Sequence, residues 1–466
     1  MQIGKRKKHQ WLDDFRSIKN IDDFFQFFSK ERLSKIALYL LIIWSVIPLF
    51  LMILSIFLDR SSAFSFMFNS GRLTIIWYMV MQQIGYLGII MTVIIILSSL
   101  RNKSKNKIPT KIYVFEHKVE LFLLLFLLWS LISSLFSSDQ ALSFLGTDYR
   151  KDGWLSYLSY SGFFGLGYLL FKEKDIIRLL RFLGTVASIL GVLLIVNMES
   201  INEIFTFYHK STVFYNPNHM GYYLVISILS LTYLAIRKPK IDTDKVICYI
   251  LFSILVVALI ENGSFGPYIA VSMGLLFLMI MTFVLEKNKL IHSISITILF
   301  IGISVIMNFE SSFLSNEINH LSEGIDDIIE DKEDADRAGS GRWGLWTNGI
   351  EFMLDKPVTG YGIENLENAY LEVDIIQDRP HNEFIQIAAT TGIIGLLLYV
   401  SALGFHFLDF FKLKKKITYD HIGILMIVFG YLVSSFFGNS MFYTTPFFIM
   451  ILGISKSMIA HQKALM

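Results

Sequence analysis

The sequence is poor in charge, cysteine and proline. Charged residues make up 17% of the 466 residues and apolar residues 54%, and the mean hydropathy is +0.54. A water-soluble domain of this length carries more charge than this. The single cysteine, Cys248, excludes an intrachain disulfide. The formal net charge of +2 gives no reason to expect a nucleic-acid partner. These absences together indicate a membrane protein.

Long apolar runs make up much of the sequence. A helix needs roughly 20 apolar residues to cross the ~30 Å hydrocarbon core of a bilayer. We therefore predict an all-α polytopic membrane protein with about twelve transmembrane helices. The predicted spans cover residues 36–58, 73–100, 119–137, 154–171, 176–197, 213–236, 246–260, 266–285, 289–308, 384–411, 421–437 and 441–458.

The distribution of charge predicts how these spans are oriented. When the basic N-terminus is placed in the cytoplasm, the loops on that side carry most of the 41 Lys and Arg residues, as the positive-inside rule requires. Both termini are then expected in the cytoplasm. The first apolar run is long and lacks a small-residue cleavage site, so we expect it to remain as a span.

One long polar segment interrupts the apolar runs. Residues 309–383 contain 18 Asp and Glu residues against five Lys and Arg residues, and the predicted orientation puts them outside. The chain then divides into a cytoplasmic amphipathic segment (1–35), a first membrane part (36–308), the outer loop (309–383) and a second membrane part (384–466). Apolar residues spaced three and four apart predict an amphipathic helix over 313–329.

An acidic run from Asp331 to Asp336 suggests calcium, but its spacing argues against this. An EF-hand frame that starts at Asp334 puts Ala338 and Leu345 where such a loop needs an oxygen ligand and a Glu. A solvated acidic turn explains the run better. We expect no metal and no other cofactor.

The GSGRWGLW motif of the outer loop combines a cation with aromatic residues. Ser340 is suited to cap a helix, which puts Arg342 in its first turn and close to the membrane surface. Trp343 and Trp346 lie on one face of that helix, and Pro357 ends it. Arg342 and Trp346 are therefore candidate ligand-binding residues.

A second motif, RPHNEF, stands at the mouth of the tenth predicted span. Pro380 suits a first helical turn, and His381 and Asn382 adjoin it. A helix N-terminus flanked by an arginine such as Arg379 is a favourable place for phosphate.

Two further motifs put polar groups on the outer side. The GTDYRKDGW loop carries Arg150 and Lys151 there, against the positive-inside trend. The NPNHMG motif puts Asn216, Asn218 and His219 at the outer end of the sixth predicted span.

Each of these features also has an ordinary structural explanation. An outer arginine commonly anchors a lipid phosphate or forms a salt bridge, and a histidine at a helix start is commonly a cap. Tryptophan is common in the interfacial aromatic belt. All these groups, however, fall on one side of the membrane at the mouths of spans. This coincidence favours one shared cavity.

The combined pattern resembles the O-antigen ligase and polymerase superfamily. The resemblance rests on about twelve spans, on a long outer loop after the ninth, and on the elements RWGLW, PVTGYG and HNEFIQIAATTGIIGLLLY. NPN and GTDYRKDGW also resemble segments of its members. The residue match is concentrated in about 339–399.

The resemblance implies a metal-independent glycosyltransferase of the bacterial cytoplasmic membrane. Such an enzyme moves a glycan from a polyprenyl (undecaprenyl) diphosphate carrier to an acceptor hydroxyl on a glycan or lipid at the outer face. Arg342 is then expected to contact the diphosphate and His381 to lie at the reacting centre. Membrane lipid, a flippase and a chain-length regulator are the expected partners. The donor and glycan are expected to contact Arg150, Arg379, Asn382, Trp346, Asn216 and Asn218.

One position departs from the family pattern. Ligases commonly carry an arginine in an SRG-like element at the start of the eighth span, and this chain has Phe265 there. Because a phenyl ring cannot hold phosphate, either Arg150 or Arg379 supplies the charge, or the donor is held differently. The departure favours a polymerase of surface-polysaccharide repeats over the alternative, a ligase-like enzyme that transfers finished glycan.

The alternative of another class is a polysaccharide or lipid transporter. Transporters usually carry charged residues near the middle of the membrane. The predicted spans have none in their middle, and their polar residues gather outside. This arrangement favours an enzyme with an outer-face site.

Overall fold

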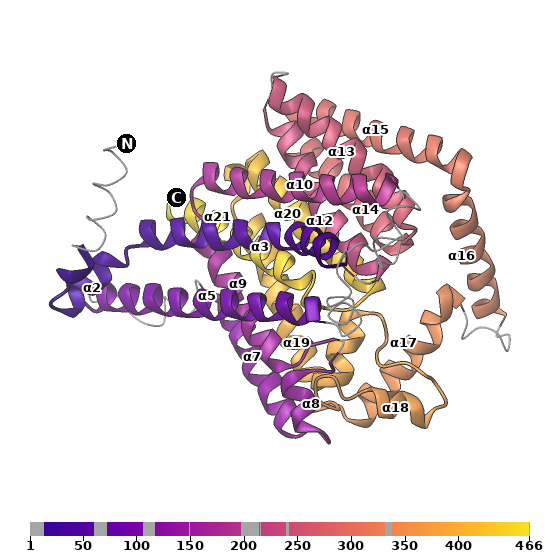
Figure 1. Ribbon diagram of the computed structural model, residues 1–466, viewed down its shortest axis with the longest axis horizontal. Coiled ribbons are helices and arrows are strands. Elements are labelled where there is room, and N and C mark those ends of the chain that lie inside the picture. Colours follow the sequence, from indigo (N-terminus) through magenta and orange to yellow (C-terminus); the bar gives the residue numbers. More distant parts are fainter. Residues whose placement is uncertain are drawn as a thin grey trace.

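The computed structural model describes residues 14–59, 72–105, 117–148, 150–196, 214, 216–238, 242–330 and 338–465. Every regular element within these ranges is a helix. Most of the helices run side by side in a bundle, and α16 to α18 cover one end of it (Figure 1). The basic start of the chain and the acidic run 331–336 lie outside the described residues.

Ten helices in the described residues are long and apolar enough to cross a membrane. The predicted all-helical membrane fold is therefore confirmed. These helices are α3 (Lys30–Asp59), α5 (Arg72–Lys105), α7 (Lys118–Leu135), α10 (Glu173–Val196), α12 (Pro217–Arg237), α13 (Thr243–Asn262), α14 (Phe265–Leu285), α15 (Lys287–Ser311), α19 (Glu383–Phe411) and α20 (Tyr419–Ser434), which η4 (Ser435–Phe437) continues.

The remaining two predicted spans coincide with α9 (Trp154–Leu169) and α21 (Thr445–Ala464). Neither is among the ten helices that satisfy the length and hydropathy requirements. α9 has 16 residues, fewer than a full crossing needs, and α21 ends in a polar turn that includes His461 and Lys463. Twelve crossings therefore stay a prediction.

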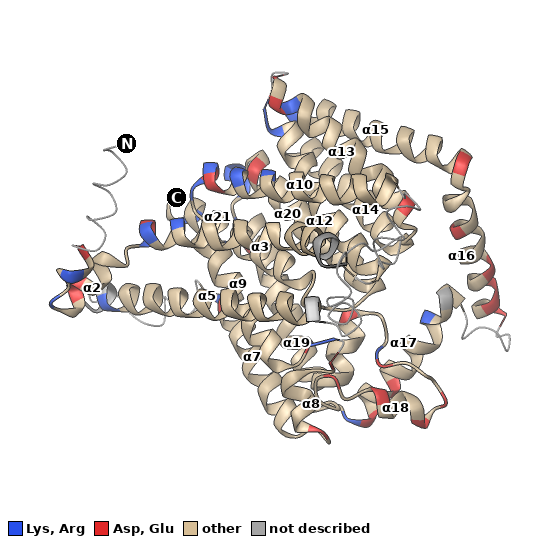
Figure 2. Ribbon diagram, viewed as in Figure 1, with Lys and Arg blue, Asp and Glu red and all other residues tan. Residues whose placement is uncertain are grey.

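Charge is segregated along the bundle (Figure 2). Lys and Arg gather around α2 (Ile21–Phe27), at the start of α3 and at the neighbouring helix ends, toward the left of the view. Asp and Glu lie along α16 (Phe313–Ile329) and α18 (Glu367–Glu372) on the opposite side. The amphipathic helix predicted over 313–329 is α16. The segregation agrees with the positive-inside rule for a cytoplasmic α2, and this orientation stays a prediction.

The outer loop contacts the membrane helices at the point where the helix α19 is broken. Gly392 has φ +70° and ψ 177°, so the predicted continuous span 384–411 is two helical pieces. The break leaves backbone groups of this buried segment without partners inside the helix, and buried backbone groups need other partners. Two side chains of α7 provide some of these hydrogen bonds. Trp129 Nε1–H donates to the Thr391 carbonyl at 2.9 Å, and the Ser133 hydroxyl donates to the Thr390 carbonyl at 2.7 Å.

The PVTGYG turn provides the other hydrogen bonds to the backbone at the break in α19. The N–H groups of Tyr361 and Gly362 donate to the carbonyls of Ala389 and Thr390, each at 2.9 Å, and the N–H of Ile393 donates to the Pro357 carbonyl at 2.8 Å. The approach requires glycine, because a Cβ on Gly392 would lie 2.1 Å from the Val358 carbonyl oxygen. The turn therefore anchors the outer loop within the membrane domain.

Candidate active site

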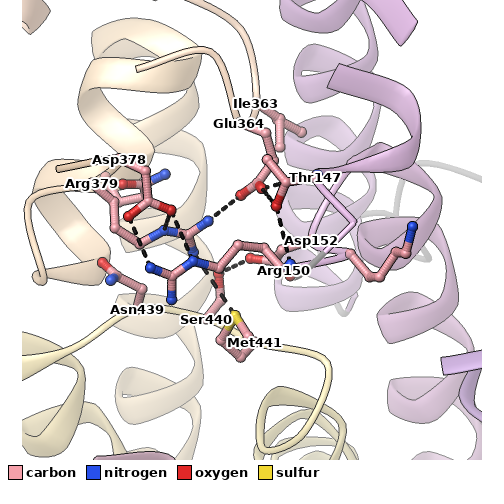
Figure 3. A network of polar contacts seen from close by, with 12 residues as sticks. Thr147, Arg150, Asp152, Ile363, Glu364, Asp378, Arg379, Asn439, Ser440 and Met441 are labelled. Atoms are coloured by element: carbon pink, nitrogen blue, oxygen red, sulfur yellow. Dashed lines mark hydrogen bonds and ion pairs between the residues drawn. The ribbon is translucent and has the colours of Figure 1, made fainter. Parts of the chain in front are cut away.

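Arg150 belongs to an ion network at the end of the bundle where α8 (Gln140–Leu145) and α9 meet. It lies between α8 and α9, and Asp378 lies just before α19. Its Nε and Nη2 groups donate to the two oxygens of Asp378, each at 2.8 Å (Figure 3). This is the bidentate geometry in which arginine binds a carboxylate most strongly.

Arg379 is the buried member of the same network, and its side chain is 1% exposed. It forms ion pairs with Glu364 and, at 3.2 Å, with Asp378. Its Nη1 lies 4.0 Å from the Met441 sulfur. Figure 3 shows the two guanidinium groups directed toward carboxylates from separate segments of the chain.

Asp152 completes the network from the start of α9. Its carboxyl accepts from the Tyr160 hydroxyl at 2.6 Å and from the Ser440 hydroxyl at 3.0 Å. Burial, with the nearby Glu364 carboxylate, raises the pKa of Asp152 to about 8. At pH 7 its carboxyl is therefore mostly neutral, and the two arginines balance two carboxylates.

The electrostatics of Asp378 follow from its two arginines. Burial alone would raise its pKa, but the guanidinium groups of Arg379 and Arg150 lower it to about 2. Asp378 is thus ionised at every physiological pH. Removing one partner of such a buried network leaves an uncompensated charge, which typically costs about 3–5 kcal/mol. The network therefore ties the loop before α9, the outer loop and the turn before α21 together.

His381 lies beside this network in a strained backbone conformation. Its φ is +53°, in the left-handed region that non-glycine residues rarely adopt. Burial and the charges of Arg150, Arg379 and Arg342 lower the pKa of His381 to about 4. The imidazole is therefore neutral near pH 7, which a proton acceptor requires.

Asn439 is the hydrogen-bond partner of His381. Its Nδ2 lies 3.3 Å from Nδ1 of the imidazole, while its Oδ1 is buried with no hydrogen-bond partner among the described residues. When Nδ2–H donates, the imidazole proton is on Nε2. When the amide is turned over, Oδ1 accepts from Nδ1–H and leaves Nε2 free to take a proton. Asn439 thus decides which nitrogen of His381 is basic.

Arg342 lies in α17 (Ala338–Asp355) and differs from the other two arginines. Its Nη1 donates to the Gly339 carbonyl at 3.3 Å, and no carboxylate in the described part of the chain pairs with it. Its positive charge lowers the pKa of His381, so the two groups interact electrostatically. α17 packs on the start of α19, where a Cβ on Gly349 would lie 3.3 Å from Pro380 Cβ.

Two local sequence predictions need correction. α17 begins at Ala338, two residues before the predicted cap Ser340. Gly339 and Gly341 have φ of +60° and +78°, so a distorted turn precedes Arg342. α19 begins at Glu383 with Asn382 as its cap, and Pro380 lies outside the helix. α17 therefore starts earlier than predicted, and α19 is preceded by a loop where a first helical turn was expected.

The other predicted site residues have mixed surroundings. Asn382 accepts from the N–H groups of Phe384 and Ile385, and Asn216 accepts from the N–H of Asn218. Both asparagines therefore cap their helices. The Trp346 Nε1–H is buried and has no hydrogen-bond partner in the described residues. Their roles in binding substrate stay predictions.

Sequence reasoning missed the acidic half of the site. Asp152, Glu364 and Asp378 were visible as outer acidic residues, but nothing in their spacing indicates that they share partners. Asn439 carries no charge and stands in a short turn, so no signal pointed to it. His219 is 5% exposed, and within the described residues both its ring nitrogens lack a hydrogen-bond partner.

These features define a class: a multi-pass membrane protein with a cluster of buried polar and charged groups at one end of its helices. The family model described as O-antigen ligase matches residues 250–400, which include Arg342 and His381. This match supports membership of the O-antigen ligase and polymerase superfamily, as the sequence motifs predicted. No curated protein matches it. The family supports a bacterial membrane enzyme that handles glycans, similar to O-antigen ligases.

Proposed function

We propose that the protein transfers glycan from a polyprenyl-diphosphate carrier to an acceptor hydroxyl at the outer face of the bacterial cytoplasmic membrane. The observation that carries this proposal is that Arg342, which has no carboxylate partner among the described residues, acts electrostatically on the neutral His381. The closed network of Arg150 and Arg379 supports the loop that presents His381. The proposal includes cytoplasmic termini and an outer loop.

Arg342 is proposed to bind the diphosphate of the donor. Breaking a bond between a sugar and a diphosphate requires little help beyond neutralising charge on the leaving group, and a guanidinium group binds phosphate oxygens bidentately without a metal. The positive end of α17 adds to this attraction. Removing one such contact typically costs ~3 kcal/mol, or roughly a hundredfold in rate.

His381 is proposed to accept the proton of the acceptor hydroxyl. A neutral imidazole with a free ring nitrogen serves as a general base when it is within hydrogen-bond reach of the hydroxyl. Asn439 in its turned orientation holds the proton on Nδ1 and leaves Nε2 for this task. Trp346 and Asn218 are proposed to contact the glycan.

Arg150 and Arg379 are proposed to act mainly by positioning. Both already bind carboxylates, so either one would have to give up an ion pair to reach the diphosphate. Within the proposal they supply positive potential to the site and hold Asp378 beside His381. In this proposal, Arg150 and Arg379 supply the positive charge of the arginine that family ligases carry at the position of Phe265, although they supply it from other positions in the chain.

Polymerisation of surface-polysaccharide repeats is the particular reaction that we favour, because Phe265 lacks the phosphate-binding group of the ligase pattern. A deletion strain tests this choice. Loss of a polymerase leaves single repeat units on the carrier, whereas loss of a ligase-like enzyme leaves full-length polymer on the lipid. Wild-type polymer length and attachment in the deletion strain would contradict both reactions. A flippase and a chain-length regulator are the partners that polymerisation would require.

A transporter is the second candidate function, and one feature bears on it. Lys456 is buried and paired with Asp409 at 2.8 Å, joining α21 to α19. Intramembrane charge pairs of this kind occur in transporters. Asp409 lies near the end of α19, however, and Lys463 from the last turn of α21 also contacts it at 2.6 Å. This pair is better explained as a clamp between helix ends.

A further inference from the structure

The helix α12 is buried along its whole length, and its first turn lies beside the candidate active site. Among the ten candidate membrane helices in the described residues, only α12 has a completely buried apolar stretch. His219, in the first turn, interacts electrostatically with Arg150, Arg379 and His381. The start of α12 is therefore close to both the ion network and the proposed base.

Tyr222 follows His219 by three residues and so lies on the same face of α12. Its hydroxyl packs against the turn that precedes α21, because a Cβ on Gly438 would lie 1.6 Å from the Tyr222 hydroxyl oxygen. Glycine at position 438 permits this close approach. The next residue in the turn is Asn439, the hydrogen-bond partner of His381. The Tyr222 hydroxyl is therefore adjacent to the group that orients the proposed base.

Tyr222 also interacts with groups from two other helices. It interacts electrostatically with Arg342 of α17 and with Glu383, the first residue of α19. Two polar side chains of α12 are thus close to both the proposed diphosphate-binding arginine and the proposed base, and the proposed reaction does not yet use either of them.

Neither of these two side chains is satisfied by the described part of the chain. His219 is 5% exposed and Tyr222 is 2% exposed. Both ring nitrogens of His219 and the hydroxyl of Tyr222 lack a hydrogen-bond partner among the described residues. A buried polar group without a partner costs the free energy of its desolvation, and a ligand that pairs with it offsets this cost.

The chemistry of the two groups indicates which ligand they suit. In a neutral imidazole one ring nitrogen donates and the other accepts, and a phenol hydroxyl does both. A sugar hydroxyl also donates and accepts, so it can use both kinds of group. A phosphate offers acceptors alone, and at Tyr222 it would meet the carboxyl group of Glu383. Hydroxyl groups of a sugar therefore match His219 and Tyr222 better than phosphate does.

We propose that His219 and Tyr222 bind the acceptor sugar through hydroxyl groups next to the one that reacts. This inference rests on the proposed function and adds to it two residues that select and place the acceptor. The acceptor oxygen forms its bond to the anomeric carbon of the donor sugar as the bond from that carbon to the diphosphate breaks. The electron pair leaves with the diphosphate at Arg342, and the hydroxyl proton passes to His381. His219 and Tyr222 hold the acceptor and exchange no proton in this step.

The test measures transfer by the full-length protein from its polyprenyl-diphosphate-linked glycan to a soluble acceptor. The acceptor is a repeat-unit oligosaccharide whose reducing end is capped with a fluorescent tag, and donor and acceptor concentrations are varied separately. Tyr222→Phe removes one hydroxyl and His219→Leu removes both ring nitrogens. His219→Gln keeps one donor and one acceptor group, so it serves as the conservative variant.

Tyr223→Phe is the matched control. Tyr223 is the next residue of α12, is also buried, and its hydroxyl likewise has no hydrogen-bond partner among the described residues. Its ring, however, packs on Phe214 and Phe447, at centroid distances of 4.9 Å and 5.2 Å. The control therefore removes the same atom from the same helix at a position among aromatic rings.

We expect KM for the acceptor to rise about five- to tenfold in Tyr222→Phe and His219→Leu, the usual factor for one hydrogen bond. KM for the donor should stay within about twofold of wild type, as expected for groups that contact the acceptor alone. His219→Gln should recover most of the acceptor affinity, and Tyr223→Phe should change neither constant. The thermal stability of Tyr222→Phe should not fall, because the hydroxyl has no partner to lose among the described residues.

Three results would overturn the proposal: an unchanged acceptor KM in both Tyr222→Phe and His219→Leu, an equal rise of the donor KM, or the same change in Tyr223→Phe. Each of them requires transfer by the wild-type protein, so each would leave the proposed function standing. Absence of transfer by the wild-type protein would instead contradict the proposed polymerisation, and this proposal would fail with it.

Discussion

Arg379 and Arg342 stand on the same outer segment, yet their surroundings are opposite. Arg379 is 1% exposed and bound to Glu364 and Asp378, whereas Arg342 is partly exposed and has no carboxylate partner among the described residues. A buried, paired cation is held in place by its partners and is costly to disturb. A cation without such a partner keeps its charge available for a ligand. We infer from this difference that the two arginines have different roles in the proposed site.

The largest effect is expected at the reacting centre. His381→Ala should reduce transfer by ~10²–10⁴-fold, because the proton acceptor is lost. The protein should still insert at normal abundance, since His381 has one hydrogen-bond partner. Transfer from a synthetic lipid-diphosphate donor, measured per amount of purified protein, checks this. Activity within a few-fold of wild type would remove His381 from the mechanism.

Arg379→Ala should act mainly on the folded state. It leaves the Glu364 carboxylate buried without its cation, at a typical cost of about 3–5 kcal/mol. We expect a strong fall in abundance and in thermal stability, measured in detergent for the full chain. Arg379→Lys keeps the charge and should recover part of both. Normal stability of the alanine variant would show that the closed network is not structural.

Arg342→Ala should show the reverse behaviour. Transfer should fall by roughly a hundredfold as one diphosphate contact is lost, while abundance and thermal stability stay near wild type. The same two measurements made for Arg379→Ala serve here, which sharpens the comparison. If Arg342→Ala is unstable instead, the two arginines do not differ as described.

Asn439→Leu should cause a smaller loss of transfer, about tenfold, because nothing then holds the proton on Nδ1 of His381. Asn439→Asp offers only acceptor oxygens, keeps Nδ1–H in place and should retain more activity than the leucine variant. Equal activities of the two variants would show that Asn439 does not set the tautomer.

The pH profile is the finest test. Because the pKa of His381 is about 4, the neutral form persists above that value and the rate should fall only as the pH drops through about 4. Arg342→Gln removes a positive charge that lowers the pKa of His381, so its remaining activity should be lost at a higher pH. An acid limb near the ordinary histidine value of ~6.5 in wild type would contradict this.

The helices and the polar site were predictable to different extents. Apolar runs and their length predicted the membrane helices, because crossing a bilayer imposes a simple length requirement. The break at Gly392 was not predicted, since ATTGIIG has the same apolar character as a continuous span. The backbone groups at the break are hydrogen-bonded to the distant turn around Tyr361, and a local sequence pattern does not predict such distant partners.

The candidate site could be predicted from the sequence only in part, for the same reason. His381 and Arg342 were predicted because several polar and cationic groups at the mouths of spans fall on one predicted side of the membrane, and their roles stay predictions. The partners of Arg379 were not found, because Glu364 and Asp378 come from a segment with many acidic residues. Which arginine is paired with carboxylates and which has none among the described residues depends on tertiary packing, so spacing in the sequence does not predict it.

The central claim is that Arg342 and His381 form the reacting centre of a glycan transferase. Its most direct test is transfer from a purified polyprenyl-diphosphate-linked glycan by Arg342→Ala and His381→Ala at matched amounts of folded protein. The account predicts near-complete loss of transfer in both variants with normal thermal stability. Transfer at the wild-type rate in both variants would contradict it.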